Sequence, residues 1–218
     1  MINATRFTAF AAAAVATASF AFAPAASAQG PKGVVPGKPG DANIVEIAAA
    51  VSAATATATQ PGEFAYLLAA ATCEQLDGAV VALLTGSDKY TLFAPTNAAF
   101  IALQTTLINA FELDIEPAPE VTCAVDALLG EGTLFAVLAY HVTEGRRFSN
   151  SVFNRNSSKF VEMLAGGYVV ANPNLTLSDN AGQTVGIVPK IGALDTVNVN
   201  ASNGVIHVID TVLLPIVP

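Results

Sequence analysis

Apolar residues recur with helical spacing through the first half of the chain. In the segment EFAYLLAAAT (63–72), four of them fall at positions i, i+3, i+4 and i+7: Phe64, Leu67, Leu68 and Ala71. This spacing places apolar side chains on one face and predicts an amphipathic α-helix. Helical spacing continues through Leu76, Val80, Leu83 and Leu84, and Gly86 is a suitable helix end.

One strand and three more helices are predicted around this segment. YTLFAP (90–95) has the pattern of a short strand ended by Pro95, and Thr96 or Asn97 supplies a cap for the next helix. The apolar face of that helix consists of Phe100, Leu103 and Leu107. In TLFAVLAYHV (133–142) the helical stripe consists of Leu134, Val137, Leu138 and His141. IVEIAAAVSAATATAT (44–59) begins as a helix, and its Ala/Thr continuation is a weaker helix or a longer loop.

The second half of the chain changes to short β-type segments. Gly166-Gly167 separates FVEML from YVVA and predicts a hairpin. Further strand patterns follow, divided by turn-forming residues: LTLS, TVGIV, TVNVN and GVIHVIDTVLL. Helices first and strands afterwards predict an α+β fold, with an antiparallel sheet system covered by helices.

The strand pattern also addresses the chain's two histidines. In GVIHVIDTVLL (204–214) both alternating faces are largely apolar, as in a strand buried on both sides. We therefore expect His207 to be a hydrogen-bonded core residue, and His141 likewise, because it extends a helical apolar stripe. A metal-binding or catalytic role for either ring is the alternative.

The N-terminus has the pattern of an export signal. Arg6 precedes an apolar run that extends to about residue 23, and Ala26-Ser27-Ala28 forms a small-residue cleavage site. A membrane anchor is the alternative, but polar residues and Pro24 break the run, and an anchor needs about 20 continuous apolar residues. We therefore expect a signal peptide at 1–28, a flexible Gly/Pro linker at 29–43 and one domain at 44–218, secreted or periplasmic, with no membrane span after cleavage.

The net charge of the chain argues against nucleic acid as a partner. Without residues 1–28, eight Lys+Arg remain against seventeen Asp+Glu, a net charge of −9. Such an acidic protein is a poor ligand for nucleic acid, which is bound by neutralising phosphates.

Cys73 and Cys123 are the only cysteines. Export to an oxidising compartment favours a disulfide between them, and two separately buried thiols are the alternative.

Common catalytic motifs are absent from the sequence. It contains no Gly-x-Ser-x-Gly elbow, no His-Glu-x-x-His and no Gly-rich phosphate loop. A Cys–His dyad would require a free cysteine beside a histidine, which the expected disulfide opposes. We therefore predict a protein that is not an enzyme and that has no metal site.

Three segments in order resemble the signature segments of the fasciclin-type domain family: YTLFAPTNAAF (90–100), LAYHV (138–142) and ASNGVIHVIDTVLLP (201–215). The stretch NIVEIAA from Asn43 is similar to the usual start of that domain. The resemblance implies an α+β fold in which two packed β-sheets form a wedge with helices along one side. It also implies a secreted or surface-attached protein of cell or matrix adhesion, in a family where some members bind carotenoids and no catalytic residue set is shared.

Candidate binding residues come from the resemblance and from local charge. Tyr140-His141 matches a Tyr-His pair that the family associates with receptor binding. Tyr140 lies off the Leu134 stripe, so its ring is either partly exposed or packed on a neighbouring strand. Asn198-Val199 stands where receptor-binding members have Asp-Ile, so the receptor pattern is incomplete. The stretch 146–160 has no acidic residue and carries four cations, Arg146, Arg147, Arg155 and Lys159. These predict contact with an anionic polysaccharide or with the acidic face of another copy, and an exposed loop without a partner is the alternative.

Other polar features leave the partner open. Asp114, Glu116 and Glu120 form either a solvated acidic face or a weak calcium site. Glycosylation sequons begin at Asn156, Asn174 and Asn200. The sequence thus predicts a secreted, non-catalytic binding or adhesion module that engages cell-surface or matrix proteins or glycans, with possible self-association. A carrier of an apolar small molecule, such as a carotenoid held between helices and sheet, is the alternative.

Overall fold

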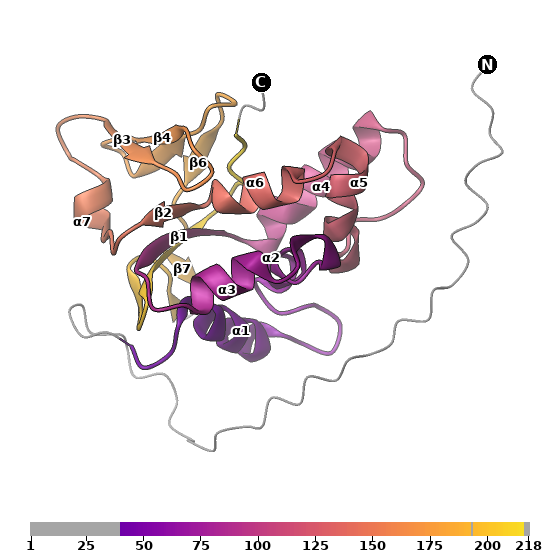
Figure 1. Ribbon diagram of the computed structural model, residues 1–218, viewed down its shortest axis with the longest axis horizontal. Coiled ribbons are helices and arrows are strands. Elements are labelled where there is room, and N and C mark those ends of the chain that lie inside the picture. The colour runs from indigo at the N-terminus through magenta and orange to yellow at the C-terminus, as the bar shows by residue number, and fades with distance from the viewer. Residues whose placement is uncertain (1–39, 193, 216–218) are drawn as a thin grey trace. The chain divides into compact units, whose positions relative to one another are not determined.

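The computed structural model describes residues 40–192 and 194–215 (Figure 1). The expected signal peptide (1–28) and most of the expected linker lie outside the described residues. The helices, in chain order, are α1 (Ile44–Thr55), α2 (Ala65–Ala71), α3 (Ala79–Thr85), α4 (Asn97–Ala110), α5 (Ala124–Leu129), α6 (Thr133–Ala139) and α7 (Ser149–Val152), with 3-10 turns η1 (Glu74–Leu76) and η2 (Pro119–Cys123).

The strands form two four-stranded sheets and a small hairpin. The first sheet has the order β2-β1-β10-β9, made of β2 (Val142–Glu144), β1 (Tyr90–Pro95), β10 (Gly204–Ile209) and β9 (Val199–Ala201). The second sheet has the order β3-β4-β5-β6, made of β3 (Lys159–Glu162), β4 (Tyr168–Ala171), β5 (Thr176–Ser178) and β6 (Thr184–Gly186). The hairpin joins β7 (Lys190–Ile191) to β8 (Leu194–Asp195). The α+β class expected from the sequence is confirmed.

The two central strands of the first sheet, β1 and β10, are buried on both faces along their whole length. They pair in parallel, with Tyr90 opposite Gly204 and Pro95 opposite Ile209. The expectation of a wholly antiparallel sheet system is therefore wrong at this pair. A parallel pair needs a long crossover connection, and here helices α4 to α7 and the entire second sheet lie between the two strands in the sequence.

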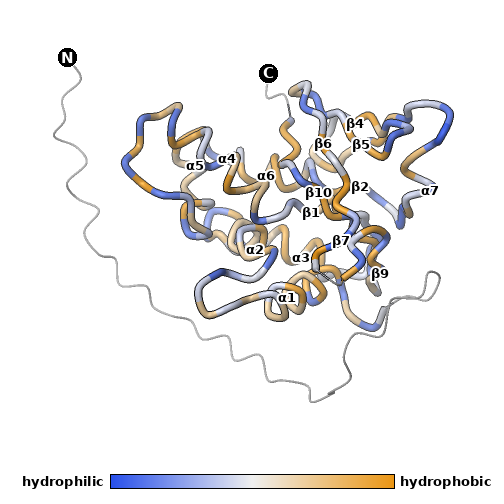
Figure 2. The backbone as a smooth tube through the Cα atoms, turned by 180° about the vertical axis from the view of Figure 1, so that it is seen from behind, coloured by the Kyte–Doolittle hydropathy of each residue, from blue (hydrophilic) through white to orange (hydrophobic). Residues whose placement is uncertain are grey.

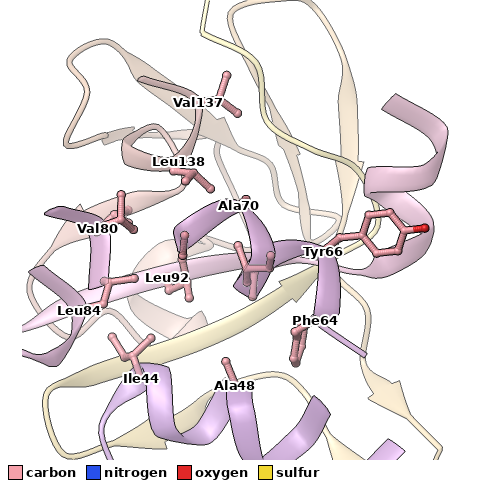
Figure 3. Close-up of a cluster of buried hydrophobic side chains, with 14 of the residues drawn as sticks. Ile44, Ala48, Phe64, Tyr66, Ala70, Val80, Leu84, Leu92, Val137 and Leu138 are labelled. Carbon is pink, nitrogen blue, oxygen red and sulfur yellow. The ribbon is translucent and has the colours of Figure 1, made fainter. Parts of the chain in front are cut away.

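One face of the first sheet is covered by helices. Even-numbered residues of the central strands, such as Leu92 and Ile206, pack in a core with side chains of α1, α2, α3 and α6. Figure 3 shows Leu92 surrounded by Ile44, Ala70, Leu84 and Leu138. The helical spacing read from the sequence supplies this layer, and Figure 2 shows α1 and α3 as hydrophobic segments.

The other face of the first sheet packs against the second sheet (Figure 1). Phe93 and Ile209 project from the central strands into a second core. The inward residues of the second sheet meet them there: Val161, Val169, Ala171, Leu177 and Val185. Alternation of buried and more exposed residues along β4 follows from this one-sided burial, and on β3 only Val161 is buried.

Local chemistry sets where several helices begin and end. Asn43 and Glu46 form a capping box at the start of α1, and the Thr96 hydroxyl accepts the Ala99 N–H at the start of α4. The helical spacing from Leu76 does not give one continuous helix. Asp77 and Gly78 adopt positive φ angles of 46° and 70°, which separate η1 from α3.

The buried side chain of Asn203 ties the helices to the turn before β10. Its Oδ1 accepts the Ile44 N–H at 3.0 Å, and its Nδ2 donates to the Leu84 carbonyl at 2.6 Å. Gly204 follows because the backbones approach closely there. A Cβ at Gly204 would overlap the Tyr90 carbonyl oxygen and lie 2.6 Å from Ile44 Cδ1.

Cys73 and Cys123 form a disulfide, as expected from the sequence. It joins the end of α2 to η2, and Cys73 is buried. Because the bond closes a loop with a sequence separation of 50 residues, it restricts the unfolded chain considerably.

We expect Cys73→Ala/Cys123→Ala to lower the free energy of unfolding by about 4 kcal/mol, from the entropy of that loop. Urea unfolding at neutral pH, with and without reductant, measures the effect. Reductant should shift the wild-type midpoint and leave the double variant unchanged. Equal midpoints for the oxidised and reduced wild type would contradict this assignment.

Candidate functional site

Both histidines are buried, and each ring uses both of its nitrogens. His207, on β10, donates from Nε2 to the Arg147 carbonyl at 2.8 Å and accepts the Asn198 N–H on Nδ1 at 3.3 Å. Its ring stacks on Phe93 with the centroids 5.7 Å apart. Burial lowers the pKa of His207, so the ring is neutral at neutral pH.

His141, just after α6, is held in the opposite tautomer. Its Nδ1 donates to the Val137 carbonyl at 2.7 Å, and its Nε2 accepts the Leu213 N–H at 2.9 Å. Burial lowers the pKa of His141 to about 4. With all four nitrogens engaged, these rings act as connectors between segments. Within 40–192 and 194–215, no group of three or more His, Cys, Asp or Glu side chains is arranged to hold a metal ion.

Tyr140 lies in the core, so of the two expected placements the packed ring is found and the partly exposed ring is not. It has no exposed surface and packs with Phe93 and Val169 between the two sheets. Its hydroxyl donates to the Tyr168 carbonyl at 2.7 Å, and burial raises its pKa. The residue leaves the α6 stripe, as the spacing indicates, but the second sheet covers the side toward which it turns.

The four cations of 146–160 do not form one patch. Arg146 donates to the side-chain oxygen of the buried Asn200, and Arg147 lines a cavity described below. Arg155 and Lys159 lie together in a groove beside α7, with a volume of about 510 Å³. Lys159 Nζ donates to the Ser151 carbonyl at 2.6 Å. Neither Arg155 nor Lys159 forms an ion pair with any described residue.

Two exposed aromatic rings, which the sequence analysis did not select, lie on the outer face of the second sheet. Phe160 on β3 is 66% exposed and Tyr168 on β4 is 48% exposed. The rings meet edge to face with their centroids 4.8 Å apart. The alternation around the buried Val161 and Val169 could have shown that both rings point outward. Their contact depends on the β3–β4 register, which pairs Glu162 with Tyr168.

Uncharged polar groups continue this solvent face of the second sheet. Asn172 Nδ2 donates to the Thr176 and Ser178 hydroxyls, and its Oδ1 accepts from the Ser158 hydroxyl at 3.0 Å. We call Arg155, Lys159, Phe160 and Tyr168 the β3 surface. Its two rings share the outer sheet face with these hydroxyl and amide groups, whereas Lys159 alternates to the face of Val161 and lines the α7 groove with Arg155.

A separate cavity of about 230 Å³ lies between the edge strands of the two sheets, β2 and β3. It is lined by Thr143, Glu144, Arg147, Glu162, Met163, Leu164 and Gly166. Thr143 has no exposed surface, and its hydroxyl has no hydrogen-bond partner in the described structure. A buried polar atom of this kind is uncommon in folded proteins.

The glycosylation sequons and the acidic residues lie in different parts of the folded chain. Asn156 and Asn174 are exposed, whereas Asn200 is 2% exposed, so a glycan cannot reach the third sequon in the folded chain. Asp114 and Glu116 line an open groove beside α4. An enclosed apolar cavity between α4, η2 and α6 has a volume of about 100 Å³, below the roughly 300–1,000 Å³ of ligand pockets. A carotenoid does not fit this cavity as it stands.

Among the described residues, no single helix is long and apolar enough to cross a membrane. One bent pair of helical segments, Pro119–Leu129 with Thr133–Ala139, has the length and composition of a span, and by length and composition only.

Sequence similarity to known proteins places this chain in one domain family. The Fasciclin domain model matches residues 64–215. Protein sll1483 of Synechocystis sp. (strain ATCC 27184 / PCC 6803 / Kazusa) is 32% identical over 174 residues, 79% of this chain and 79% of that protein. This chain therefore belongs to the fasciclin domain family. Such domains occur in extracellular proteins and are generally non-catalytic adhesion modules.

A solved structure of a FAS1 domain pair from the insect cell adhesion molecule Fasciclin I is also similar. It matches 64% of this chain with 19% identity and a TM-score of 0.39. The chain spans 43% of the length of that domain pair.

The buried histidines predict a loss of stability in mild acid. The pKa of His141 is about 4 in the folded chain and about 6.5 when unfolded, so between these values the unfolded chain binds a proton that the folded chain does not. Stability therefore falls as the pH is lowered, by about 2 kcal/mol between pH 7 and pH 5 from this residue. His207 acts in the same direction.

Urea unfolding of the wild type and of His141→Gln at several pH values measures this effect. The variant should be less stable at pH 7 but should lose less stability on acidification, because Gln does not titrate. A pH dependence identical to that of the wild type would contradict the assignment.

Thr143 and Thr91 face each other across β2 and β1 and form a matched pair. The Thr91 hydroxyl donates to the Gly145 carbonyl and accepts the Arg147 N–H, whereas the Thr143 hydroxyl has no partner among the described residues. We expect Thr91→Val to lower the free energy of unfolding by about 2 kcal/mol and Thr143→Val to leave it unchanged or raise it by up to about 1 kcal/mol. Chemical unfolding of both variants tests this, and equal destabilisation would contradict it.

Proposed function

We propose that this chain is an exported, non-catalytic adhesion module whose β3 surface binds an anionic polysaccharide of a cell surface or matrix. The observation that carries the proposal is the pair of exposed rings, Phe160 and Tyr168, in edge-to-face contact. Lys159, next to Phe160 in the chain, lines the α7 groove with Arg155, and neither cation forms an ion pair with a described residue. Membership of the fasciclin family supports the general class of function.

The aromatic pair supplies apolar contact area at low entropic cost. Each ring rests against the other, so little side-chain freedom remains to be lost on binding. A sugar ring has an apolar face, which packs on aromatic rings. It also has hydroxyl groups at its rim, which form hydrogen bonds. Asn172 and Ser158 lie next to the β3–β4 pair on the same sheet face as the two rings. Their amide and hydroxyl groups can form hydrogen bonds with the hydroxyl groups of a sugar.

The charges favour an acidic polymer over a neutral one. The whole chain carries a net charge of −8, so an anionic polymer is repelled except where cations are concentrated. Arg155 and Lys159 are the cations nearest to Phe160 in the chain, and they offset the exposed Glu162, which lies opposite Tyr168. Because both cations are exposed, their contribution decreases as salt is added.

Export supports the same assignment. The expected signal peptide at 1–28 and the Cys73–Cys123 disulfide both suit an oxidising compartment outside the cytoplasm. A polysaccharide of the cell surface or matrix is available there.

We expect the purified chain to bind alginate, a polyuronate, and not neutral dextran, with affinity that falls between 50 and 300 mM salt. Phe160→Ala/Tyr168→Ala should weaken binding at least tenfold, because it removes the apolar contact. Lys159→Glu should weaken it about fivefold or more, because it replaces an attractive charge by a repulsive one. Biolayer interferometry on immobilised polymers measures these changes.

Lys190→Glu is the matched control, since it reverses another exposed lysine on a strand outside the β3 surface. It should change alginate binding less than twofold. The proposal fails if alginate and dextran bind equally, if neither binds, or if Lys190→Glu and Lys159→Glu have the same effect. Chromatographic sizing of each variant shows whether the same cations instead join two copies of the chain, a result that would also overturn the proposal.

A further inference from the structure

The cavity between β2 and β3 has features of a small-molecule site that is distinct from the β3 surface. Each of the two strands is the outermost member of its sheet, so the cavity lies where two sheet edges come together. One backbone hydrogen bond, from the Leu164 N–H to the Val142 carbonyl at 2.7 Å, closes one end. The volume of about 230 Å³ lies below that of pockets for drug-sized ligands and restricts the ligand to a smaller molecule, of roughly amino-acid size.

The backbone of β2 presents polar groups toward this cavity. Phe93 N–H donates to the His141 carbonyl and Gly145 N–H donates to the Lys89 carbonyl, so odd-numbered residues of this strand face β1. Alternation then directs the backbone groups of Val142 and Glu144 toward the free edge. The Glu144 carbonyl accepts from Arg147 Nε at 2.9 Å.

Thr143 adds a buried side-chain donor and acceptor to the wall. Its register partner Thr91 is satisfied by two hydrogen bonds, whereas the Thr143 hydroxyl has none within the described part of the chain. Desolvating a hydroxyl without a partner is costly, and a bound polar group would remove that cost.

Arg147 is fixed in place at the cavity. Its N–H donates to the Thr91 hydroxyl, its carbonyl accepts from His207, and its Nε donates to the Glu144 carbonyl. The remaining guanidinium nitrogens have no hydrogen bond to the described residues. They form a fork that can bind a carboxylate through two bonds.

The carboxylates of Glu144 and Glu162 line the same cavity without pairing with Arg147. Between described residues, the one ion pair within 4.0 Å is Lys190–Asp195. Opposite charges that share a cavity, yet remain separate, match a ligand that carries both charges.

We propose that the cavity between β2 and β3 binds a small zwitterion of the α-amino-acid class. Arg147 binds the ligand carboxylate, Glu144 and Glu162 bind its ammonium group, and the Thr143 hydroxyl donates to a carboxylate oxygen. Met163 and Leu164 contact the apolar part of the side chain.

Other ligand classes fit these groups less well. A divalent cation would be repelled by Arg147, and a simple anion would be repelled by two carboxylates. A neutral sugar would leave three charges without a counterpart, and no aromatic ring lines the cavity to pack against it. This inference does not depend on polysaccharide binding, because it shares no residue with the β3 surface.

The experiment is a thermal-shift survey of the full chain with each of the twenty L-α-amino acids, followed by calorimetric titration of those that raise the melting temperature. For the best of them, two analogues are titrated in parallel: the amine that lacks the carboxylate and the acid that lacks the ammonium group. We expect the amino acid to bind at least tenfold more tightly than either analogue.

Three variants assign the groups. Arg147→Met keeps the backbone bonds of residue 147 and should lower amino-acid affinity at least tenfold, leaving it no better than that of the amine analogue. Glu162→Gln should also lower amino-acid affinity, because it removes a partner of the ammonium group. The amino acid should then bind about as well as the acid analogue. Thr143→Val should lower affinity about fivefold while the chain remains as stable as the wild type.

Glu131→Gln, at an exposed acidic residue outside the cavity, is the matched control and should leave affinity unchanged. The proposal is overturned if no amino acid binds, if either analogue binds as tightly as the amino acid, or if Arg147→Met and Glu162→Gln reduce all three ligands equally. The last result would mark these residues as structural.

Discussion

The parallel pairing of β1 with β10 is the constraint on which the rest of the structure depends. Both strands are buried along their full length, with the helix layer on one face and the second sheet on the other. Every polar group on them must therefore bond internally, because an unpaired group there would cost more than one bond contributes. Asn203 holds the helices to the turn before β10, and His207 holds the Arg147 carbonyl to its other face.

This constraint also decides where a partner can bind. The interior is occupied by packed side chains, and the two histidines are neutral connectors. Besides the open grooves beside α4 and α7, the accessible sites include two at the margins of the sheets: the solvent face of β3 and β4, and the space between the free edges of β2 and β3. Both proposed sites contain a strand edge for the same reason, since edge backbone and outward side chains are the groups that the core does not use.

Local patterns in the sequence were sufficient for most individual elements. The apolar spacing from Phe64 and the cap at Thr96 gave helices, and the doubly apolar GVIHVI gave a buried strand. Their assembly was not local. The parallel direction of β10 depends on a partner more than a hundred residues away, and the contact of Phe160 with Tyr168 depends on hairpin register. The cavity at Thr143 forms only where two sheets meet, so no spacing in the sequence marks it.

Tyr140 contacts the backbone beneath the β3 surface although its own side chain is buried. The family pattern suggested a contact residue, but the ring lies between the sheets and its hydroxyl donates to the carbonyl of Tyr168. That bond fixes the backbone of β4 at the residue whose ring faces solvent. Met163 and Val169, on either side of the hairpin, are buried in the same core as Tyr140. Tyr140, at the end of α6, thus joins the helix layer to the strand that carries the Tyr168 ring.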